Sequence, residues 1–188
     1  ETMWLCVVEV VRSIKQKTKP VQAIGISVLC PGLVSLDKEG IPLRPAVIHL
    51  DRRSVREAKW ALRTIGKGRF LSTAGNLPYP GGVSLTSILW IKRHEPEIYR
   101  RTWMFGHTNT FLIKRLTGKW GIDPTNASFT GLYNTMEATD WDRAIINGLD
   151  VDSRKLPQIF PSYSVIGRLR SDVAKHLKIA SGIPVVMG

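Results

Sequence analysis

The sequence predicts an α/β fold, because short apolar runs typical of strands alternate along the chain with helical patterns. The 188 residues are enough for one domain of ordinary size. A hydrophobic content of 43% supplies a core, and a charged content of 22% argues against disorder. There is no apolar run of about 18 residues or more, so no transmembrane helix is expected. Residues 1–15 do not follow the signal-peptide pattern, and we expect a cytoplasmic protein without membrane contact.

The first third of the chain combines one helix with three strands. Helical spacing over residues 3–15 is set by Trp4, Val7, Val8, Val11 and Ile14, and "KTKP", ending in Pro20, predicts a linker. Strands are predicted over 21–29, 32–37 and 46–51. The third is nearly all apolar, as in a strand covered on both faces. Ser54 and Glu57 have capping-box spacing, which predicts a helix from Ser54 to near Gly66.

The remainder continues the alternation of helices, loops and strands. Loops are predicted over 71–83 and 120–131, and helices over 84–94, from Pro96, and from about Asn109 to a C′ glycine at Gly118. Short helices with aspartate caps are expected within 140–149 and 150–156. Strands are predicted over 164–170 and 182–188, with Ser171 capping a helix through Leu177 between them.

Charge and cysteine usage narrow the class of partner. The net charge is +12, from 27 Lys and Arg against 15 Asp and Glu. The basic residues are dispersed, which favours solvated helix faces and makes nucleic acid an unlikely partner. A basic nucleic-acid-binding module remains an alternative, which salt-sensitive binding would reveal. Cys6 and Cys30 are far apart and without zinc spacing, which indicates reduced thiols in a reducing compartment.

The clearest candidate for chemistry is "HLDRRS" at 49–54. The chain has no Walker A, G-x-G-x-x-G or G-x-S-x-G motif. Strand alternation would put His49 and Asp51 on one face at a strand-to-helix junction, where they could bond sugar hydroxyls. An equally good interpretation is that the aspartate pairs with an arginine of this motif, which includes Arg52, and that the pair only fixes the junction.

Three other places have a weaker case for function. In "GNLPYPGG", 75–82, Tyr79 could be a stacking platform, but an ordinary connecting loop is favoured. In "GIDPTNAS", 121–128, the favoured interpretation of Asp123, Asn126 and Ser128 is an Asx-turn with helix caps. Cys30 is favoured as a small buried residue over a reactive thiol.

Several segments in order resemble the N-terminal domain of the FGGY carbohydrate kinases, in particular their xylulokinase branch. They include "AIGISVLCPGLVSLDKEGIPLRPAVIHLDRRS", "AGNLPYPGGVSLTSILWIKRHEPEIYRR", "FLIKRLTGKWGIDPTNASFTGLYN" and the stretch 140–188, so the resemblance covers essentially all 188 residues. It implies a ribonuclease H-like, actin-like ATPase fold that is incomplete at both ends. Residues 1–188 would then be most of the sugar-binding domain, without the first β-hairpin and the C-terminal nucleotide domain.

The resemblance implies ATP-dependent phosphorylation of a sugar or polyol, with Mg²⁺, by the intact parent. The general-base aspartate is expected directly after Gly188, so we expect no catalytic and no metal-ligating residue within the chain. The chain alone should be inactive, and an unpaired sheet edge should favour self-association, for instance as a homodimer. A non-catalytic sugar-binding relative is a further alternative.

The resemblance also implies a set of substrate-binding residues. These are Cys30, Pro31, His49, Asp51, Arg53, Tyr79 and Asn109. The sugar-contact turn, Gln-Met-His-Gly in xylulokinases, reads Leu29-Cys30-Pro31-Gly32 here. Ser87 replaces a usual lysine, and Thr108-Asn109-Thr110 stands at the Lys-Asp-Tyr element. These departures surround the expected sugar position, so they indicate an unusual sugar or polyol.

Overall fold

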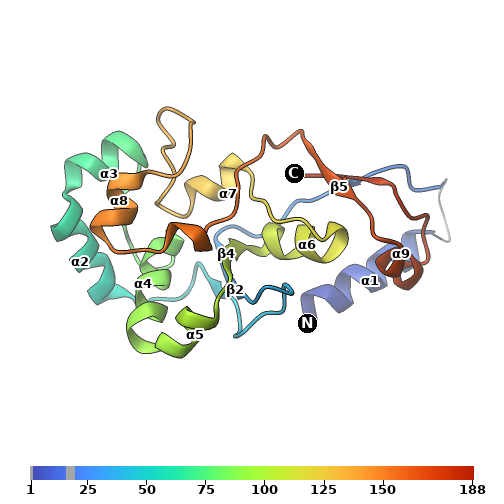
Figure 1. Cartoon of the computed structure of the whole chain (residues 1–188), viewed down its shortest axis with the longest axis horizontal. Helices are drawn as coiled ribbons and strands as arrows, with labels where there is room; N and C mark the ends of the chain where they lie inside the picture. Colours follow the sequence, from blue (N-terminus) through green and yellow to red (C-terminus); the bar gives the residue numbers. More distant parts are fainter. Residues whose placement is uncertain (1, 16–19) are drawn as a thin grey trace.

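The computed structural model describes residues 2–15 and 20–188, and it confirms the α/β class. The helices are α1 (Thr2–Lys15), α2 (Val55–Ile65), α3 (Lys67–Thr73), α4 (Ser84–His94), α5 (Pro96–Arg101), α6 (Thr108–Thr117), α7 (Pro124–Ser128), α8 (Arg143–Gly148) and α9 (Ser171–Leu177), with a 3₁₀ turn η1 (Ser153–Lys155). The strands are β1 (Ile24–Gly25), β2 (Gly32–Leu36), β3 (Val47–Ile48), β4 (Met104–His107), β5 (Val165–Arg168) and β6 (Pro184–Val186). Helices α2, α3, α4, α5 and α8 gather at one end of an elongated molecule, and α1, α9 and β5 lie at the other (Figure 1).

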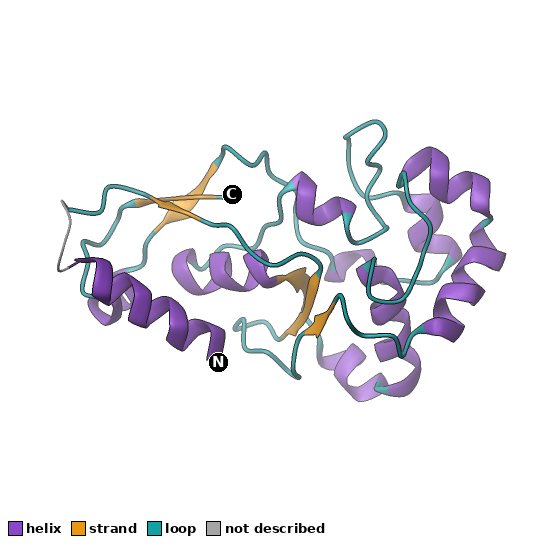
Figure 2. Cartoon of the chain, turned by 180° about the vertical axis from the view of Figure 1, so that it is seen from behind, coloured by secondary structure: helices purple, strands orange, loops and turns teal. Residues whose placement is uncertain are grey.

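The strands form two small sheets, which Figure 2 shows as separate groups of arrows. One sheet has the order β3-β2-β4, and both neighbours of β2 are antiparallel to it. The other has the order β1-β6-β5, in which β1 is parallel and β5 antiparallel to β6. The second sheet therefore joins β1, near the beginning of the chain, to β5 and β6, near its end.

Strand β2 separates two hydrophobic cores. Val34 and Leu36 point into a core shared with α1, α6 and α9, whereas Leu33 points into a second core built from α2, α4 and α8. This division follows from the period of two in a strand, since successive side chains face opposite sides of the sheet. Every residue of β2 is buried, and so is every residue of β4, so both strands are covered on both faces.

The structure corrects several predicted strands. The strands predicted over 21–29 and 46–51 are reduced to the two-residue strands β1 and β3. Ile48 in β3 is 38% exposed, so the expectation that the strand at 46–51 is covered on both faces is wrong. Strand β4 and helix α3 were not predicted. Helix α7 lies within the predicted loop 120–131, and α3 takes up 71–73 of the other loop. Residues 17–19 of the predicted linker lie outside the described residues, and Pro20 has no regular structure.

The two predicted serine caps are also wrong. Ser54 precedes α2 but makes no capping bond, because its hydroxyl donates to Thr86 Oγ1 at 2.9 Å. Ser171 is the first residue of α9, with Arg170 at the cap position. The aspartate caps hold, since Asp142 and Asp152 accept from backbone N–H groups in the first turns of α8 and η1. No helix in the described part of the chain has both the length and the apolar character that crossing a membrane requires.

Candidate functional site

One edge of the sheet β3-β2-β4 brings most of the predicted site residues together. Gly32, which directly follows Cys30 and Pro31, pairs with Ile48, after which the chain continues to His49. Leu33 pairs with His107, the last residue of β4. Because both neighbours run antiparallel to β2, its first residues lie beside the last residues of β3 and β4. The Cys30 turn, the His49 loop and the start of α6 at Thr108 therefore meet at one place.

The guanidinium of Arg52 joins the His49 loop to the Tyr79 loop. Its Nη1 donates to the carbonyl oxygens of His49, at 2.6 Å, and of Pro80, at 2.8 Å. Gly81 permits this approach, because its φ is +76° and a Cβ there would lie 2.2 Å from Arg52 Nη1. The two loops are thus fixed relative to each other by one side chain.

Asp51 is held by Arg53 in a bidentate ion pair. Arg53 donates its backbone N–H and its Nε to Asp51 Oδ1, both at 3.0 Å, and Nη2 lies 2.8 Å from Oδ2. Burial favours the neutral carboxyl, but the hydrogen bonds and charge of Arg53 outweigh it, so the pKa of Asp51 is lowered. The Arg53 guanidinium also lies 4.7 Å from the ring centroid of Trp90. Asp51 therefore forms the Asp–Arg pair of the junction-fixing interpretation, with Arg53 as its partner. Its carboxylate stays ionised.

His49 and Tyr79 are exposed on this surface, as are Arg52 and Arg53. His49 lies in a turn after the end of β3, so the strand alternation predicted for His49 and Asp51 does not occur. Its side chain is exposed, and Tyr79 is 46% exposed. Both can contact a ligand without any rearrangement of the core.

A buried histidine, His107, lies beneath this surface and links helix α4, helix α7 and the Cys30 turn. It is 0% exposed. Its Nε2 is 2.7 Å from Ser84 Oγ, its Nδ1 is 3.1 Å from Asn126 Oδ1, and Cys30 Sγ lies 3.6 Å from Nδ1. Asn126 uses its amide N–H₂ as a donor elsewhere, so its oxygen accepts the proton of His107 Nδ1. His107 Nε2 is then the acceptor for the Ser84 hydroxyl.

Burial determines the ionisation of His107. It lowers the pKa of His107 to about 4, although the bond to Asn126 and the charge of Asp123 act in the opposite direction. The histidine is therefore neutral near pH 7, in the tautomer that its partners require. A serine bonded to a neutral histidine can resemble a nucleophile and its base. Ser84 is 3% exposed, so no substrate reaches it, and the pair supports the structure.

Asp123 is the centre of the buried polar network. Its Oδ1 accepts from the backbone N–H of Asn126 at 2.9 Å, as the predicted cap of α7. Its Oδ2 accepts from Asn126 Nδ2 at 2.7 Å and from Asn109 Nδ2 at 2.6 Å. Asn109 is 1% exposed and its Oδ1 accepts from the backbone N–H of Thr110, so its amide faces the network. Asn109, predicted to bind substrate, is thus buried beneath the surface with its side chain bonded within this network.

The Cys30 turn is the apolar wall of the site. Pro31 is buried and the peptide bond before it is cis. Burial, together with the nearby Asp123 carboxylate, raises the pKa of the Cys30 thiol to about 12. Cys30 is consequently a neutral thiol, as the sequence favoured, and not an activated nucleophile.

Sequence reasoning missed His107 and Ser84 and undervalued Asn126. Their partners are far along the chain, and the signal that could have found them is a polar residue ending a buried apolar strand. Ser128 donates to the carbonyl of Thr125 at 2.7 Å, a local turn contact. Ser87 is 6% exposed within α4. In the described ranges, no three His, Cys, Asp or Glu side chains are arranged to hold a metal ion.

Comparison with known proteins identifies relatives of the whole chain. Residues 1–188 match the model of the FGGY family of carbohydrate kinases, N-terminal domain. The chain is 29% identical over 157 residues to the xylulose kinase of Staphylococcus xylosus, covering 84% of this chain and 32% of that kinase. It is 30% identical over 193 residues to the L-xylulose/3-keto-L-gulonate kinase of Escherichia coli (strain K12), covering 99% of this chain and 38% of that kinase. The chain thus spans about a third of the length of these curated relatives.

Solved structures agree with this assignment. A ligand-bound xylulose kinase from Lactobacillus acidophilus superposes with a TM-score of 0.85 at 25% identity, covering 97% of this chain and 37% of that one. The Plasmodium falciparum glycerol kinase with ADP gives a TM-score of 0.81 at 25% identity, covering 95% of this chain and 36% of that one. The fold of this chain is therefore that of the corresponding part of sugar and polyol kinases.

Proposed function

Because this chain belongs to the FGGY family of carbohydrate kinases, we propose that it is the sugar-binding domain of an enzyme that phosphorylates a sugar or polyol. The phosphoryl donor is ATP, with Mg²⁺, a proposal supported by the names of the kinase relatives and by the ADP in the glycerol kinase structure. Phosphoryl transfer is assigned to the whole protein that contains this chain. The task of the chain is to bind and orient the acceptor hydroxyl, since positioning supplies much of the catalysis in such reactions.

The observation that supports this best is the edge of the sheet β3-β2-β4. There the exposed His49 and Tyr79 stand beside the Asp51–Arg53 pair, and Arg52 fixes the two loops. His49 and Asp51 supply hydrogen-bonding groups for hydroxyls, and Tyr79 supplies a flat apolar face for a carbon skeleton. The buried network around His107 holds this surface still, which lowers the entropy lost on binding.

The acceptor that fits this edge is a neutral, pentulose-like sugar or a polyol. Arg53 is already paired with Asp51, and the Cys30 turn presents a thiol and a proline ring instead of an ionic group. Recognition therefore falls to His49 and Asp51. The two free cysteines, Cys6 and Cys30, support the proposal of a reducing, cytoplasmic location.

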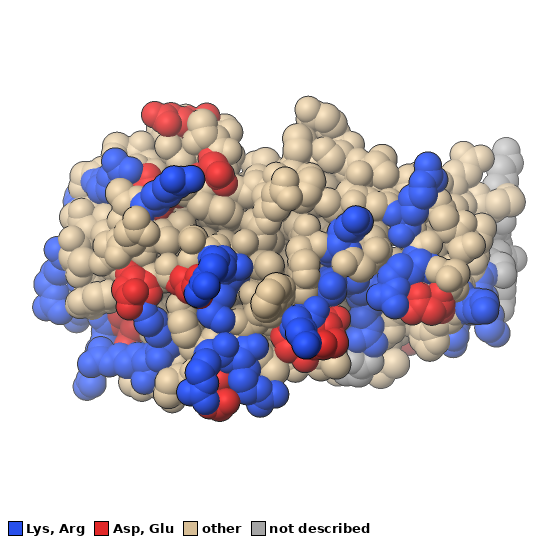
Figure 3. Space-filling view, viewed as in Figure 1, with Lys and Arg blue, Asp and Glu red and all other residues tan. Residues whose placement is uncertain are grey.

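The distribution of charge does not favour the nucleic-acid alternative. Several basic side chains are in ion pairs with neighbouring carboxylates, among them Arg69 with Asp142 and Arg170 with Asp172. On the face shown in Figure 3, Lys and Arg are interspersed with Asp and Glu and form separate clusters. Nucleic-acid binding by a positively charged groove would need a continuous basic surface.

The test is a panel of ketoses, aldoses and polyols offered with Mg²⁺ and ATP to the full-length protein that contains this chain, with ADP release as the readout. We expect at least one of these acceptors to be phosphorylated. Replacing His49 by Ala should raise KM for that acceptor about tenfold, the value of one hydrogen bond. The control is His176→Ala, which changes an exposed histidine in α9 at the other end of the molecule. No phosphorylated acceptor, or an equal KM for both variants, would contradict the proposal.

A further inference from the structure

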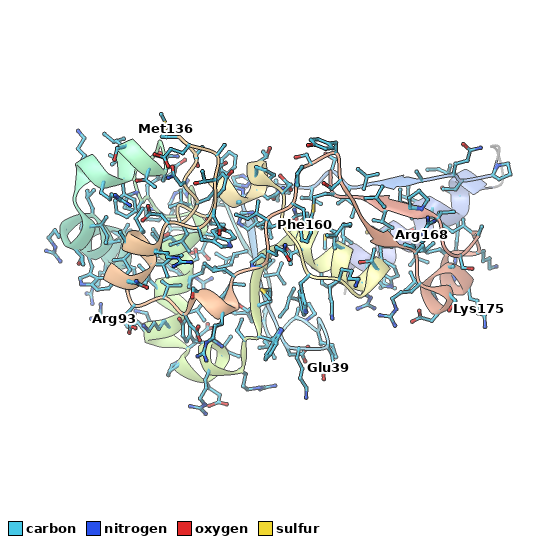
Figure 4. The ribbon with its side chains drawn as sticks, turned by 45° about the horizontal axis from the view of Figure 1, so that its top comes forward. Glu39, Arg93, Met136, Phe160, Arg168 and Lys175 are labelled. Atoms are coloured by element: carbon cyan, nitrogen blue, oxygen red, sulfur yellow. The ribbon has the colours of Figure 1, made fainter. Side chains whose placement is uncertain are left out.

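A cavity lies at the helical end of the molecule, away from the edge of the sheet that carries His49. It has a volume of about 540 Å³ and is formed by α2, α4 and the residues after α8. Its walls are Glu57, Trp60, Leu89, Lys92, Arg93, Leu149 and Asp150. Figure 1 shows these three helices side by side, and Figure 4 labels Arg93 at this end, far from Arg168 and Lys175. The proposed sugar site uses none of these residues.

Glu57 lines this cavity, and its two carboxylate oxygens differ in their partners. Its side chain is 3% exposed. Its Oε1 accepts from His94 Nε2 at 3.3 Å and lies 3.7 Å from Arg93 Nη1. Its Oε2 is buried and has no hydrogen-bond partner among residues 2–15 and 20–188. A buried carboxylate oxygen without a hydrogen-bond donor costs free energy, so a donor supplied to this oxygen would be stabilising.

The other charged groups of the cavity do not donate a hydrogen bond to Glu57 Oε2. Lys92 Nζ lies 2.6 Å from Asp150 Oδ2 and also donates to the Asp150 carbonyl, so these two charges neutralise each other. The Arg93 side chain is 63% exposed and is directed largely to solvent. What remains is one acceptor, Glu57 Oε2, beside apolar walls.

The apolar walls are large enough to hold a small organic body. Leu89 is 4% and Leu149 1% exposed, and both belong to the core beneath the cavity. Trp60 is 40% exposed and lines the open side. Cavities of this size with apolar walls and one or two polar groups are typical of small-molecule sites.

We propose that this cavity binds a small primary amine with an apolar body. The ammonium group donates to Glu57 Oε2, since a charge-assisted hydrogen bond is the strongest available compensation for a buried carboxylate. The body packs against Trp60, Leu89 and Leu149. The ligand class differs from the neutral sugar or polyol of the other site, so this second site does not depend on the proposed kinase function.

Binding at this site has a built-in optical signal. Trp60 lines the cavity itself. Trp90 stacks on His94 at 4.9 Å between ring centroids, and His94 is the residue bonded to Glu57. A ligand on Glu57 therefore changes the surroundings of Trp60 directly and of Trp90 through His94, which intrinsic fluorescence can report.

The experiment titrates benzylamine and cyclohexylmethylamine into the full-length protein that contains this chain, without sugar or nucleotide, by calorimetry and tryptophan fluorescence. We expect saturable binding of at least one amine at one site per chain, and no binding of benzoate, which has the ring of benzylamine but an anionic group. Glu57→Gln should weaken binding of the amine about tenfold or more. The control is Glu97→Gln, an exposed carboxylate of α5 paired with Arg100, which should leave binding unchanged.

A second variant covers the case in which Glu57→Gln fails to fold. Trp60→Ala removes a partly exposed wall and should weaken amine binding by a similar factor while the circular dichroism spectrum stays that of the unchanged protein. The proposal is overturned if neither amine binds, if benzoate binds as tightly as benzylamine, or if a folded Glu57→Gln protein binds as tightly as the unchanged protein.

Discussion

Two buried carboxylates, Asp123 and Glu57, are each 3% exposed, yet their surroundings differ completely. Asp123, below the proposed sugar site, accepts three hydrogen bonds, from Asn109 and twice from Asn126. Glu57, which lines the cavity at the helical end, has one oxygen bonded to His94 and one without a hydrogen-bond partner in the described part of the chain. Equal burial therefore accompanies a completed network in one region and an incomplete site in the other.

The difference teaches where each region can change. A satisfied buried network is rigid, because any movement breaks bonds that no water replaces. It is suited to holding a binding surface in place. A half-satisfied carboxylate is suited to receiving a donor from outside, because the ligand completes what the fold leaves open. The three predictions that follow test this contrast, from the largest expected effect to the smallest.

The largest effect is expected for Asp123→Asn. The new amide places an N–H₂ group where Asp123 accepts, so donors of Asn109 or Asn126 lose their partner in a buried place. We expect the free energy of unfolding to fall by about 3 kcal/mol. Urea denaturation measures this change, and Asp172→Asn, in an exposed ion pair with Arg170, is the matched control with a loss below about 1 kcal/mol. Equal losses for the two variants would show that the network contributes little.

The next effect is a pH dependence that comes from His107. Its pKa is about 4 in the folded protein, whereas the ordinary pKa of a histidine is 6.5. Between pH 4 and pH 6.5 the unfolded chain therefore binds a proton that the folded protein does not. Stability from the neutral histidine is complete above pH 6.5 and is lost as the pH falls toward 4, by up to about 3 kcal/mol.

The measurement is the free energy of unfolding at several pH values for the unchanged protein and for His107→Gln. The difference between the two should shrink as the pH falls from 7 to 4, because glutamine has no proton to take up in this range. A difference that is constant with pH, or that grows on acidification, would rule out a buried neutral His107.

The smallest effect on stability is expected for Glu57→Gln. Glutamine keeps an acceptor for His94, and the substitution removes a buried charge that is only half paired. We expect the free energy of unfolding to change by less than about 1 kcal/mol, in the direction of higher stability. Thermal or urea unfolding of the two proteins checks this. If the variant loses as much stability as Asp123→Asn does, Glu57 is fully paired in solution and the contrast between the two carboxylates is wrong.

Local patterns were the reliable part of the sequence. The helices predicted at 84–94 and from about Asn109 to Gly118 match α4 and α6, and Gly118 adopts the left-handed conformation expected of a C′ glycine. Aspartate caps were equally dependable, since Asp123, Asp142 and Asp152 bond to N–H groups two or three residues away. All of these depend on neighbours within one or two helical turns.

Features that depend on contacts between distant parts of the chain were not predicted correctly from local patterns. Ser54 has the spacing of a capping box, but its hydroxyl donates a hydrogen bond to Thr86, 32 residues later, and not to the helix backbone. Strand β4 is a run of four residues between two helices, and it becomes a strand because β2 supplies its hydrogen-bonding partner. The sugar-site candidates His49, Asp51, Arg53 and Tyr79 remain a proposal, although their neighbourhood was expected from the resemblance.

The sequence by itself determined the α/β class, the positions of most helices and the family, because periodicity and ordered segments are properties of the linear chain. Tertiary structure alone decided that Cys30, His107 and Asn126 meet, and that no described residue donates to one oxygen of Glu57. The physical reason is that burial and hydrogen-bond satisfaction depend on strand register and helix packing. These bring together residues whose separation in the chain leaves no local pattern.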